Sequence, residues 1–208
     1  MYVFYHKMYK KLIINHNKNE GEMNMRRIVY SFIFIISMFI LVGCGEEMTP
    51  KQAVMDYMES YVTLDDSVVT QLNEYVDNDS ELNDEQKKIY KEILRKQYSS
   101  LTYEVGDERI EGDTAYVKVK INVKDLYKVR KDTNAYYETN KNEFLDEDGV
   151  YDVVLFVNYQ LNKMKDAVET VDYELELKVI KNNNDWDVTQ LSVEDLEKIH
   201  GIYNYEEE

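Results

Sequence analysis

The chain has 208 residues, with 41 acidic against 25 basic side chains, one cysteine and one proline. Its 44% apolar content excludes an intrinsically disordered acidic tail, despite a net charge of −16. One cysteine excludes an internal disulfide framework and a cysteine-rich zinc site. The acidic balance argues against a nucleic-acid partner, because binding to phosphates requires Lys and Arg.

The first predicted element is a membrane-targeting segment at residues 23–43. Arg26 and Arg27 precede fifteen uncharged residues, which run from Ile28 to Val42. A helix of this length spans about 22 Å, which is short of the ~30 Å hydrocarbon core of a bilayer. A cationic start, a short apolar middle and small residues at the end are the parts of a secretory signal peptide.

This segment ends on Leu41, Val42, Gly43 and Cys44, which resemble the lipobox of bacterial lipoproteins. The resemblance implies cleavage between Gly43 and Cys44, and acyl chains such as palmitate on the cysteine through a diacylglycerol thioether. A thiolate is the nucleophile that a thioether requires, and two acyl chains anchor stably where one is marginal. The alternative is an uncleaved N-terminal membrane helix with an incidental cysteine.

Residues 1–22 fit poorly in front of such a signal, which indicates an over-extended start codon or, alternatively, a long n-region. Removing the first 43 residues leaves 165, enough for one core and too few for a two-lobed solute-binding protein. Those 43 residues hold six Lys and Arg against two Glu, so the remainder carries a net charge of −20. We therefore expect a linker at 44–48 and a single extracytoplasmic domain at 49–208.

Three helices are predicted to open this domain. Thr49 and Pro50 suit an N-cap and a first helical position, and a second short helix is predicted from Asp66 to about Val76. After a polar loop, Asn83 and Gln86 can cap a third. Apolar residues three and four apart define the expected inward faces. These residues are Val54, Tyr57, Met58, Tyr61 and Leu64, then Val68, Val69, Leu72 and Val76, then Ile89, Tyr90, Ile93, Leu94 and Tyr98.

The apolar period changes to two after residue 100. Alternation predicts strands at 101–105 and 117–123 around a turn at 111–114, and a further pair at 171–179 and from 186 to 188. Helices are predicted at about 125–137 and at 152–165, the second with Val154, Val157, Leu161 and Met164 inward. Ser192 and Gly201 can bound a last short helix.

This order predicts an α+β domain in which N-terminal helices pack on an antiparallel sheet of about four strands, with a helical insert between two hairpins. Polar residues at alternate strand positions predict that helices cover one face of the sheet only. The layout resembles the NTF2-like or cystatin-like domains of small lipoproteins of Gram-positive bacteria, although the helical insert departs from the simplest version. That resemblance implies a cavity in which Tyr and Asp act as acid, base or oxyanion donor.

Few residues indicate chemistry. His200 is the sole histidine after residue 43, which excludes ordinary Ser-His-Asp and Cys-His catalysis and His-rich metal sites, and we expect it to interact with a helix C-terminus. The acidic stretches 77–81 and 146–149, the latter with Asp152, are weak Ca²⁺ candidates, and solvated loops with caps are favoured. Candidates to line a cavity are Tyr103, Tyr116, Tyr159 and Tyr173, although core packing explains most of them.

The sequence thus predicts a lipid-anchored extracytoplasmic binding or interaction module at the cell envelope, with no catalytic residues, metal or cofactor. Its charge near a membrane would repel anionic headgroups and attract a basic protein or divalent cations; a small ligand is the other partner considered. The alternative function is a small hydrolase or isomerase that uses a Tyr/Asp-lined cavity. A third is a structural envelope protein that acts through assembly.

Overall fold

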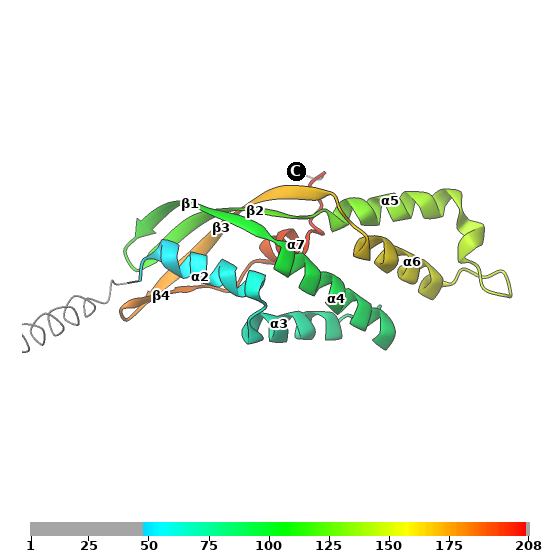
Figure 1. Cartoon of the computed structure of the whole chain (residues 1–208), viewed down its shortest axis with the longest axis horizontal. Helices are drawn as coiled ribbons and strands as arrows, with labels where there is room; N and C mark the ends of the chain where they lie inside the picture. The colour runs from blue at the N-terminus through cyan, green and yellow to red at the C-terminus, as the bar shows by residue number, and fades with distance from the viewer. Residues whose placement is uncertain (1–47, 207–208) are drawn as a thin grey trace, which may run out of the picture. The chain divides into compact units, whose positions relative to one another are not determined.

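The structure is a computed structural model that describes residues 48–206. The predicted signal peptide and lipobox lie outside these residues. The elements, labelled in Figure 1, are α2 (Pro50–Thr63), α3 (Asp66–Asp77), α4 (Asp84–Ser100), β1 (Thr102–Glu111), β2 (Thr114–Lys124), α5 (Leu126–Thr139), the 3-10 helix η1 (Lys141–Phe144), α6 (Val153–Lys165), β3 (Thr170–Asn182), β4 (Asp185–Val188) and α7 (Val193–His200).

The helices begin where the capping residues predict. The Thr49 hydroxyl accepts a hydrogen bond from the backbone N–H of Gln52, and Asn83 with Gln86 forms a reciprocal capping box at the start of α4. Leu64 was predicted to lie on the inward face of the first helix, but it lies just beyond the end of α2. It ends α2 with a φ of 55°, so its backbone N–H caps the helix and its side chain is half-buried.

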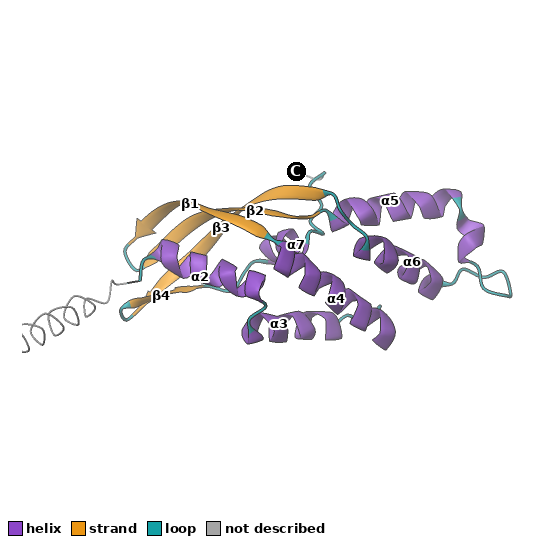
Figure 2. Ribbon diagram, in the orientation of Figure 1, coloured by secondary structure: helices purple, strands orange, loops and turns teal. Residues whose placement is uncertain are grey.

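The four strands form one antiparallel sheet in the order β1-β2-β3-β4 (Figure 2). Strands β2 and β3 pair from Thr114 opposite Ile180 to Lys124 opposite Thr170. One face of these strands is buried and carries Val117, Val119, Ile121, Tyr173, Leu175 and Leu177. The opposite face is exposed and carries Lys118, Lys120, Glu174, Glu176 and Lys178. The α+β class and the one-sided covering of the sheet are therefore confirmed.

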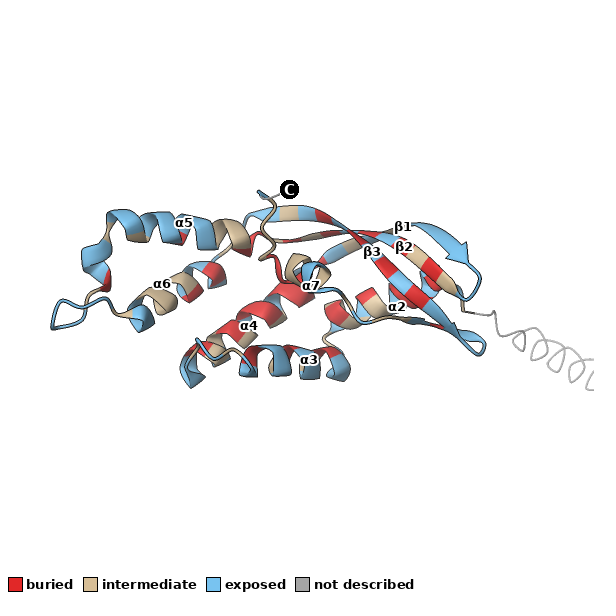
Figure 3. Ribbon diagram, turned by 180° about the vertical axis from the view of Figure 1, so that it is seen from behind, coloured by how far each residue is buried: buried red, intermediate tan, exposed pale blue. Residues whose placement is uncertain are grey.

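The core lies between the covered face of the sheet and helices α2, α4 and α7 (Figure 3). Helix α2 contacts all four strands, and both α4 and α7 contact β2. Helix α4 lies beside α2, and α3 packs against α4. Met58, Leu94 and Leu177 are almost completely buried here. Each such side chain contributes roughly 1.5–3 kcal/mol relative to exposure, which makes this layer the main source of stability.

A buried glutamine joins α4, β2 and α7. The Gln97 side chain donates to the carbonyl of Lys124 at 3.0 Å and accepts from the N–H of the same residue at 3.1 Å. Gly201, which ends α7 with a φ of 71°, packs against this pair, and a Cβ there would overlap both the Lys124 carbonyl and the Gln97 amide. The close approach therefore requires glycine at position 201.

Candidate functional site

Residues 126–165, made of α5, η1 and α6, form a helical arm between β2 and β3. Because the arm connects β2 to β3, which are paired neighbours, it projects from one end of the sheet (Figure 2). Asp125 caps α5 by accepting from the N–H of Lys128 at 2.8 Å, and Asp152 caps α6 through the N–H of Val154 at 2.8 Å. The predicted helical insert is thus confirmed, and a carboxylate starts each of its two α-helices.

An aromatic cluster packs between the two helices of the arm. The ring of buried Phe144 lies 5.4 Å from that of Tyr159 and 5.5 Å from that of Phe156, centroid to centroid. Tyr136 and Tyr159 stack at 5.2 Å across α5 and α6. Aromatic pairs contribute roughly 0.5–1.5 kcal/mol beyond their burial, so this cluster gives the arm a core of its own.

One buried amide holds the arm against the helical layer. The Oε1 of Gln86 accepts from the N–H of Asn83 at 3.0 Å, while its Nε2 donates to Oδ1 of Asn158 on α6 at 3.0 Å. An unpaired amide in this position would cost roughly 1–3 kcal/mol. The bond from Gln86 therefore fixes where α6 sits on α4.

A groove of about 430 Å³ lies at the base of the arm, between α5, α6 and residues 166–169. Val129, Ala167, Val168 and the rings of Tyr136 and Tyr159 supply its apolar lining. The charged lining consists of four carboxylates and two ammonium groups, from Asp125, Asp132, Asp166 and Glu169 and from Lys128 and Lys163. This combination favours a ligand that carries apolar and positively charged groups together.

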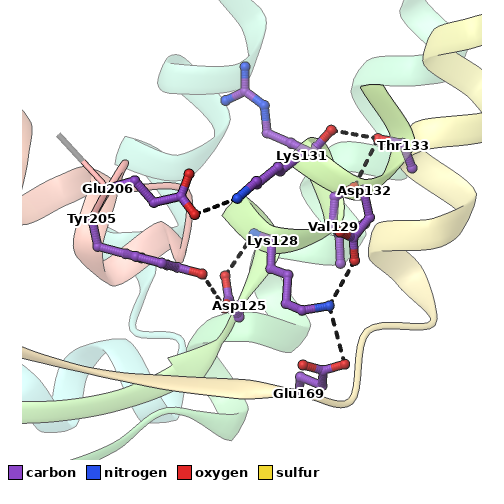
Figure 4. Close-up of polar contacts among 10 residues, drawn as sticks. Asp125, Lys128, Val129, Lys131, Asp132, Thr133, Glu169, Tyr205 and Glu206 are labelled. Atoms are coloured by element: carbon purple, nitrogen blue, oxygen red, sulfur yellow. Dashed lines mark hydrogen bonds and ion pairs between the residues drawn. The ribbon is translucent and has the colours of Figure 1, made fainter. Parts of the chain in front are cut away.

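Three of the six charged side chains of the groove form ion pairs with one another, on the α5 side that Figure 4 shows. The Nζ of Lys128 lies 2.8 Å from a carboxylate oxygen of Asp132 and 3.5 Å from one of Glu169, and these interactions raise the pKa of Lys128. The carboxylate of Asp166 differs, since it forms no hydrogen bond or ion pair with any residue from 48 to 206. Asp166 is therefore available to a basic group of a ligand.

Tyr205 and Glu206, which follow α7 in the chain, bind to residues at the start of α5. The Tyr205 hydroxyl donates to Oδ2 of Asp125 at 3.0 Å, and desolvation together with this carboxylate raises the pKa of Tyr205 to about 12. Glu206 forms an ion pair with Lys131, also visible in Figure 4. Both oxygens of Asp125 are engaged, one in the cap of α5 and one with Tyr205. This tyrosine–carboxylate pair therefore has a structural role.

The tip of the arm exposes a contiguous set of apolar side chains. Between residues 150 and 155, every residue except Asp152 is apolar and exposed, with Val150 at 60% and Val153 at 55% (Figure 3). The exposed acids Asp146, Glu147 and Asp148 directly precede this set. We define residues 150–155 as the apolar tip, and its acidic neighbours 146–148 as the acidic border.

The prediction that Val154 belongs to the buried face of α6 is wrong. Leu161 and Met164 are buried as predicted, but Val154 is 41% exposed. The first turn of α6 lies at the start of α4, where the Gln86 side chain donates to the backbone carbonyl of Val154 and leaves the Val154 side chain exposed. The signal that could have revealed the tip is the apolar run itself, because Val153, Val154 and Leu155 are consecutive at the start of α6 and cannot all face one side of a helix.

Neither a family model nor a curated protein matches this sequence. The structure is similar to that of YcdA, a candidate lipoprotein of Bacillus subtilis subsp. subtilis strain 168. The TM-score is 0.45 and the sequences are 14% identical, with 79% of this chain and 59% of YcdA covered. This chain thus matches less than two thirds of the length of YcdA.

The four tyrosines predicted as cavity residues do not meet at one site, although Tyr103 and Tyr173 line the same concave stretch of β1, β2 and β3, of about 560 Å³. Tyr103 and Tyr173 face the helices, with the Tyr103 hydroxyl on Glu59 at 3.1 Å, whereas Tyr116 lies on the exposed sheet face under the guanidinium of Arg109. Tyr159 belongs to the aromatic cluster of the arm. Leu41, Val42, Gly43 and Cys44 lie outside the described residues.

The two acidic loops use carboxylates to bind their own backbone. Asp79 accepts from the N–H of Glu81 at 2.9 Å, and Asp146 accepts from the N–H of Val150 at 2.8 Å. Over residues 48–206, no group of three or more His, Cys, Asp or Glu side chains is placed to hold a metal ion. Nor does any helix of that range have the length and apolar character needed to cross a membrane.

His200 ends α7 as predicted, but its side chain lies in the core and bonds to Tyr98, whereas an interaction with the helix C-terminus was expected. Its side chain is 1% exposed and its Nε2 lies 2.6 Å from the hydroxyl of Tyr98. Burial lowers the pKa of His200 to about 3. The imidazole is therefore neutral and does not act as a cation at the end of the helix.

Proposed function

We propose that this protein is a lipid-anchored module on the extracytoplasmic face of the cell membrane, whose arm binds a basic partner protein without catalysing a reaction. The observation that carries the proposal is the apolar tip, residues 150–155, exposed beside its acidic border. Exposed contiguous apolar surface with a charged rim is typical of a protein–protein contact. The aromatic cluster and the bond from Gln86 support the tip on a rigid arm.

The charges near the tip discriminate between possible partners. Asp146, Glu147 and Asp148 would repel a second copy of this chain and an anionic lipid surface, because both present negative charge. A partner with Lys or Arg beside apolar side chains complements the same surface. Asp166, unpaired among the described residues, extends this preference to the groove at the base of the arm. We expect the binding to weaken as salt concentration rises.

The anchor is proposed from the lipobox resemblance. After cleavage, Cys44 would carry the acyl chains, and the four residues from Gly45 to Met48 would span at most ~14 Å before the N-cap at Thr49. Cys44→Ala should move the protein from the membrane to the soluble fraction when cells are fractionated. Ser37→Ala, a small change in the same segment, is the matched control and should stay in the membrane. Membrane retention of Cys44→Ala at the wild-type level would show that lipidation is not the anchor.

Site-specific photo-crosslinking tests the binding role of the arm. A photoreactive amino acid replaces Val153, which is 55% exposed, or Ile110 on β1, which is 53% exposed and lies outside the arm. We expect a discrete adduct with a basic protein in irradiated cells from position 153 and not from position 110. Equal adducts from both positions, or an adduct with a second copy of this chain or with lipid, would contradict the proposal.

The alternative of a small hydrolase or isomerase with an NTF2-like cavity requires a tyrosine and a carboxylate that face an enclosed space. The Tyr103–Glu59 and Tyr136–Glu143 contacts are exposed at the surface. The pair of Tyr205 with Asp125 borders the groove, but both oxygens of Asp125 already bind groups of this chain. The geometry therefore favours binding over catalysis.

A further inference from the structure

A second groove, of about 520 Å³, lies between α2, α3 and residues 188–196, outside the arm. Three tyrosines line it, Tyr57, Tyr61 and Tyr75, together with side-chain amides and three aliphatic residues. Glu74 is the one charged side chain among the residues that line it in the described part of the chain. Charged residues make up 32% of the sequence, so a groove of this size with a single charge differs from the surface around it.

The tyrosine rings of this groove are held from behind. The ring of Tyr75 lies 4.5 Å from that of His200, and the ring of Tyr61 lies 5.1 Å from that of Tyr98, centroid to centroid. The hydroxyls of Tyr57 and Tyr61 are 3.4 Å apart. Tyr61 is 2% exposed and Tyr57 is half-buried, so Tyr75, at 39% exposure, offers the apolar ring face to a ligand. Because this ring is already fixed against His200, it loses little conformational entropy on binding.

Three side-chain amides border the same rings. Gln71, Asn78 and Gln190 are exposed, and their amide groups form no hydrogen bond with any other residue in the range that the structure covers. Each amide offers two N–H donors and one carbonyl acceptor. Unpaired neutral donors and acceptors beside fixed aromatic faces suit a ligand with many hydroxyl groups on rings that also present C–H faces.

From this juxtaposition we propose that the groove binds an uncharged saccharide. Its hydroxyls would bond to the amides of Gln71, Asn78 and Gln190, and one sugar ring would pack on the exposed ring of Tyr75. No Lys or Arg stands among the described residues that line the groove, which disfavours phosphorylated or carboxylated sugars. This site is separate from the arm, so its occupancy does not depend on the binding role proposed for the arm.

Titration with defined oligosaccharides tests the site. The full-length protein is purified in a detergent without a sugar headgroup, because a glycoside detergent would compete. Saturation-transfer NMR and calorimetry then measure binding of two neutral probes, cellotetraose and N-acetylchitotetraose, and of anionic tetragalacturonate. We expect a Kd of about 1 mM or lower for at least one neutral probe, and no detectable binding of tetragalacturonate.

Two matched triple variants test whether the neutral oligosaccharides bind in this groove. Replacement of Gln71, Asn78 and Gln190 by Ala should weaken binding about tenfold, since each exposed amide contributes a modest hydrogen bond. The control replaces exposed amides outside the groove, Asn142→Ala, Asn162→Ala and Asn184→Ala, and should bind like the wild type. The proposal is overturned if neither neutral probe binds, if the two variants bind equally, or if tetragalacturonate binds as tightly as the neutral probes.

Discussion

The hydroxyl of Tyr98 lies 2.6 Å from Nε2 of His200, although 102 positions separate the two residues in the chain. The bond joins α4 to α7 inside the core. The ring of Tyr75 packs against His200 as well, and Nδ1 of His200 is buried without a partner among the described residues. His200 therefore contributes packing and one hydrogen bond to the fold, and it does so as a neutral imidazole.

This burial predicts acid destabilisation. The pKa of His200 is about 3 in the folded state and 6.5 without the fold, so the unfolded chain binds more protons between these values. The stabilisation is fully present above pH 6.5 and is lost as the pH falls from 6.5 toward 3, by about 1.4 kcal/mol per pH unit. Urea denaturation from pH 7 to pH 4 should show a flatter pH dependence for His200→Gln than for the wild type. The same pH dependence in both proteins would disprove the neutral burial of His200.

Two glycine substitutions distinguish the stability cost of disturbed packing from the cost of a strained backbone. Gly201 and Gly112 have φ values of 71° and 64°, but a Cβ would overlap Lys124 and Gln97 at position 201 and meet open space at position 112. Gly112→Ala should cost about 1 kcal/mol for the left-handed backbone alone. Gly201→Ala should cost roughly 1–3 kcal/mol more, because the Gln97–Lys124 bonds must also shift. Chemical denaturation measures both, and equal losses would mean that the junction at Gly201 is not tightly packed.

Gln86 provides the test of how the arm is held. Gln86→Ala removes half of a capping box and the bond to Asn158, so we expect a loss of roughly 1–3 kcal/mol in the free energy of unfolding. Backbone amides at 153–158 should also exchange hydrogen faster. Gln52→Ala is the control, because the exposed side chain of Gln52 bonds only to Asp56, one turn away, among residues 48–206, and the change should cost less than about 0.5 kcal/mol. Unchanged exchange in Gln86→Ala would show that α6 is held by other contacts.

Local patterns predicted the secondary structure closely. The strand expected at 117–123 lies within β2, the helix expected at 152–165 is α6, and Asn83 with Gln86 forms the predicted capping box. These features depend on neighbours one to four positions away, where the period of apolar residues and the identity of the cap decide the outcome. The fold class followed from the order of these elements.

Features that depend on distant residues were not predictable in this way. The contact of Tyr98 with His200 and the bond from Gln86 to Asn158 arise from how α4, α6 and α7 pack, and no periodic pattern encodes that packing. The second groove is likewise formed by segments that are more than a hundred positions apart. That groove therefore required the tertiary structure, whereas the apolar run at 150–155 is a signal of the tip in the sequence itself.

A charge reversal at the acidic border tests the binding role of the arm most directly. Glu147→Lys with Asp148→Lys is made in the protein that carries the photoreactive residue at position 153, and the yield of adduct is measured in irradiated cells. The control, Asp113→Lys with Asp185→Lys, makes the same change in net charge at exposed acids outside the arm. We predict that the first pair lowers the yield at least fivefold and that the control leaves it unchanged. An equal yield in the two variants, or no adduct from the unaltered border, would contradict a basic partner on the arm.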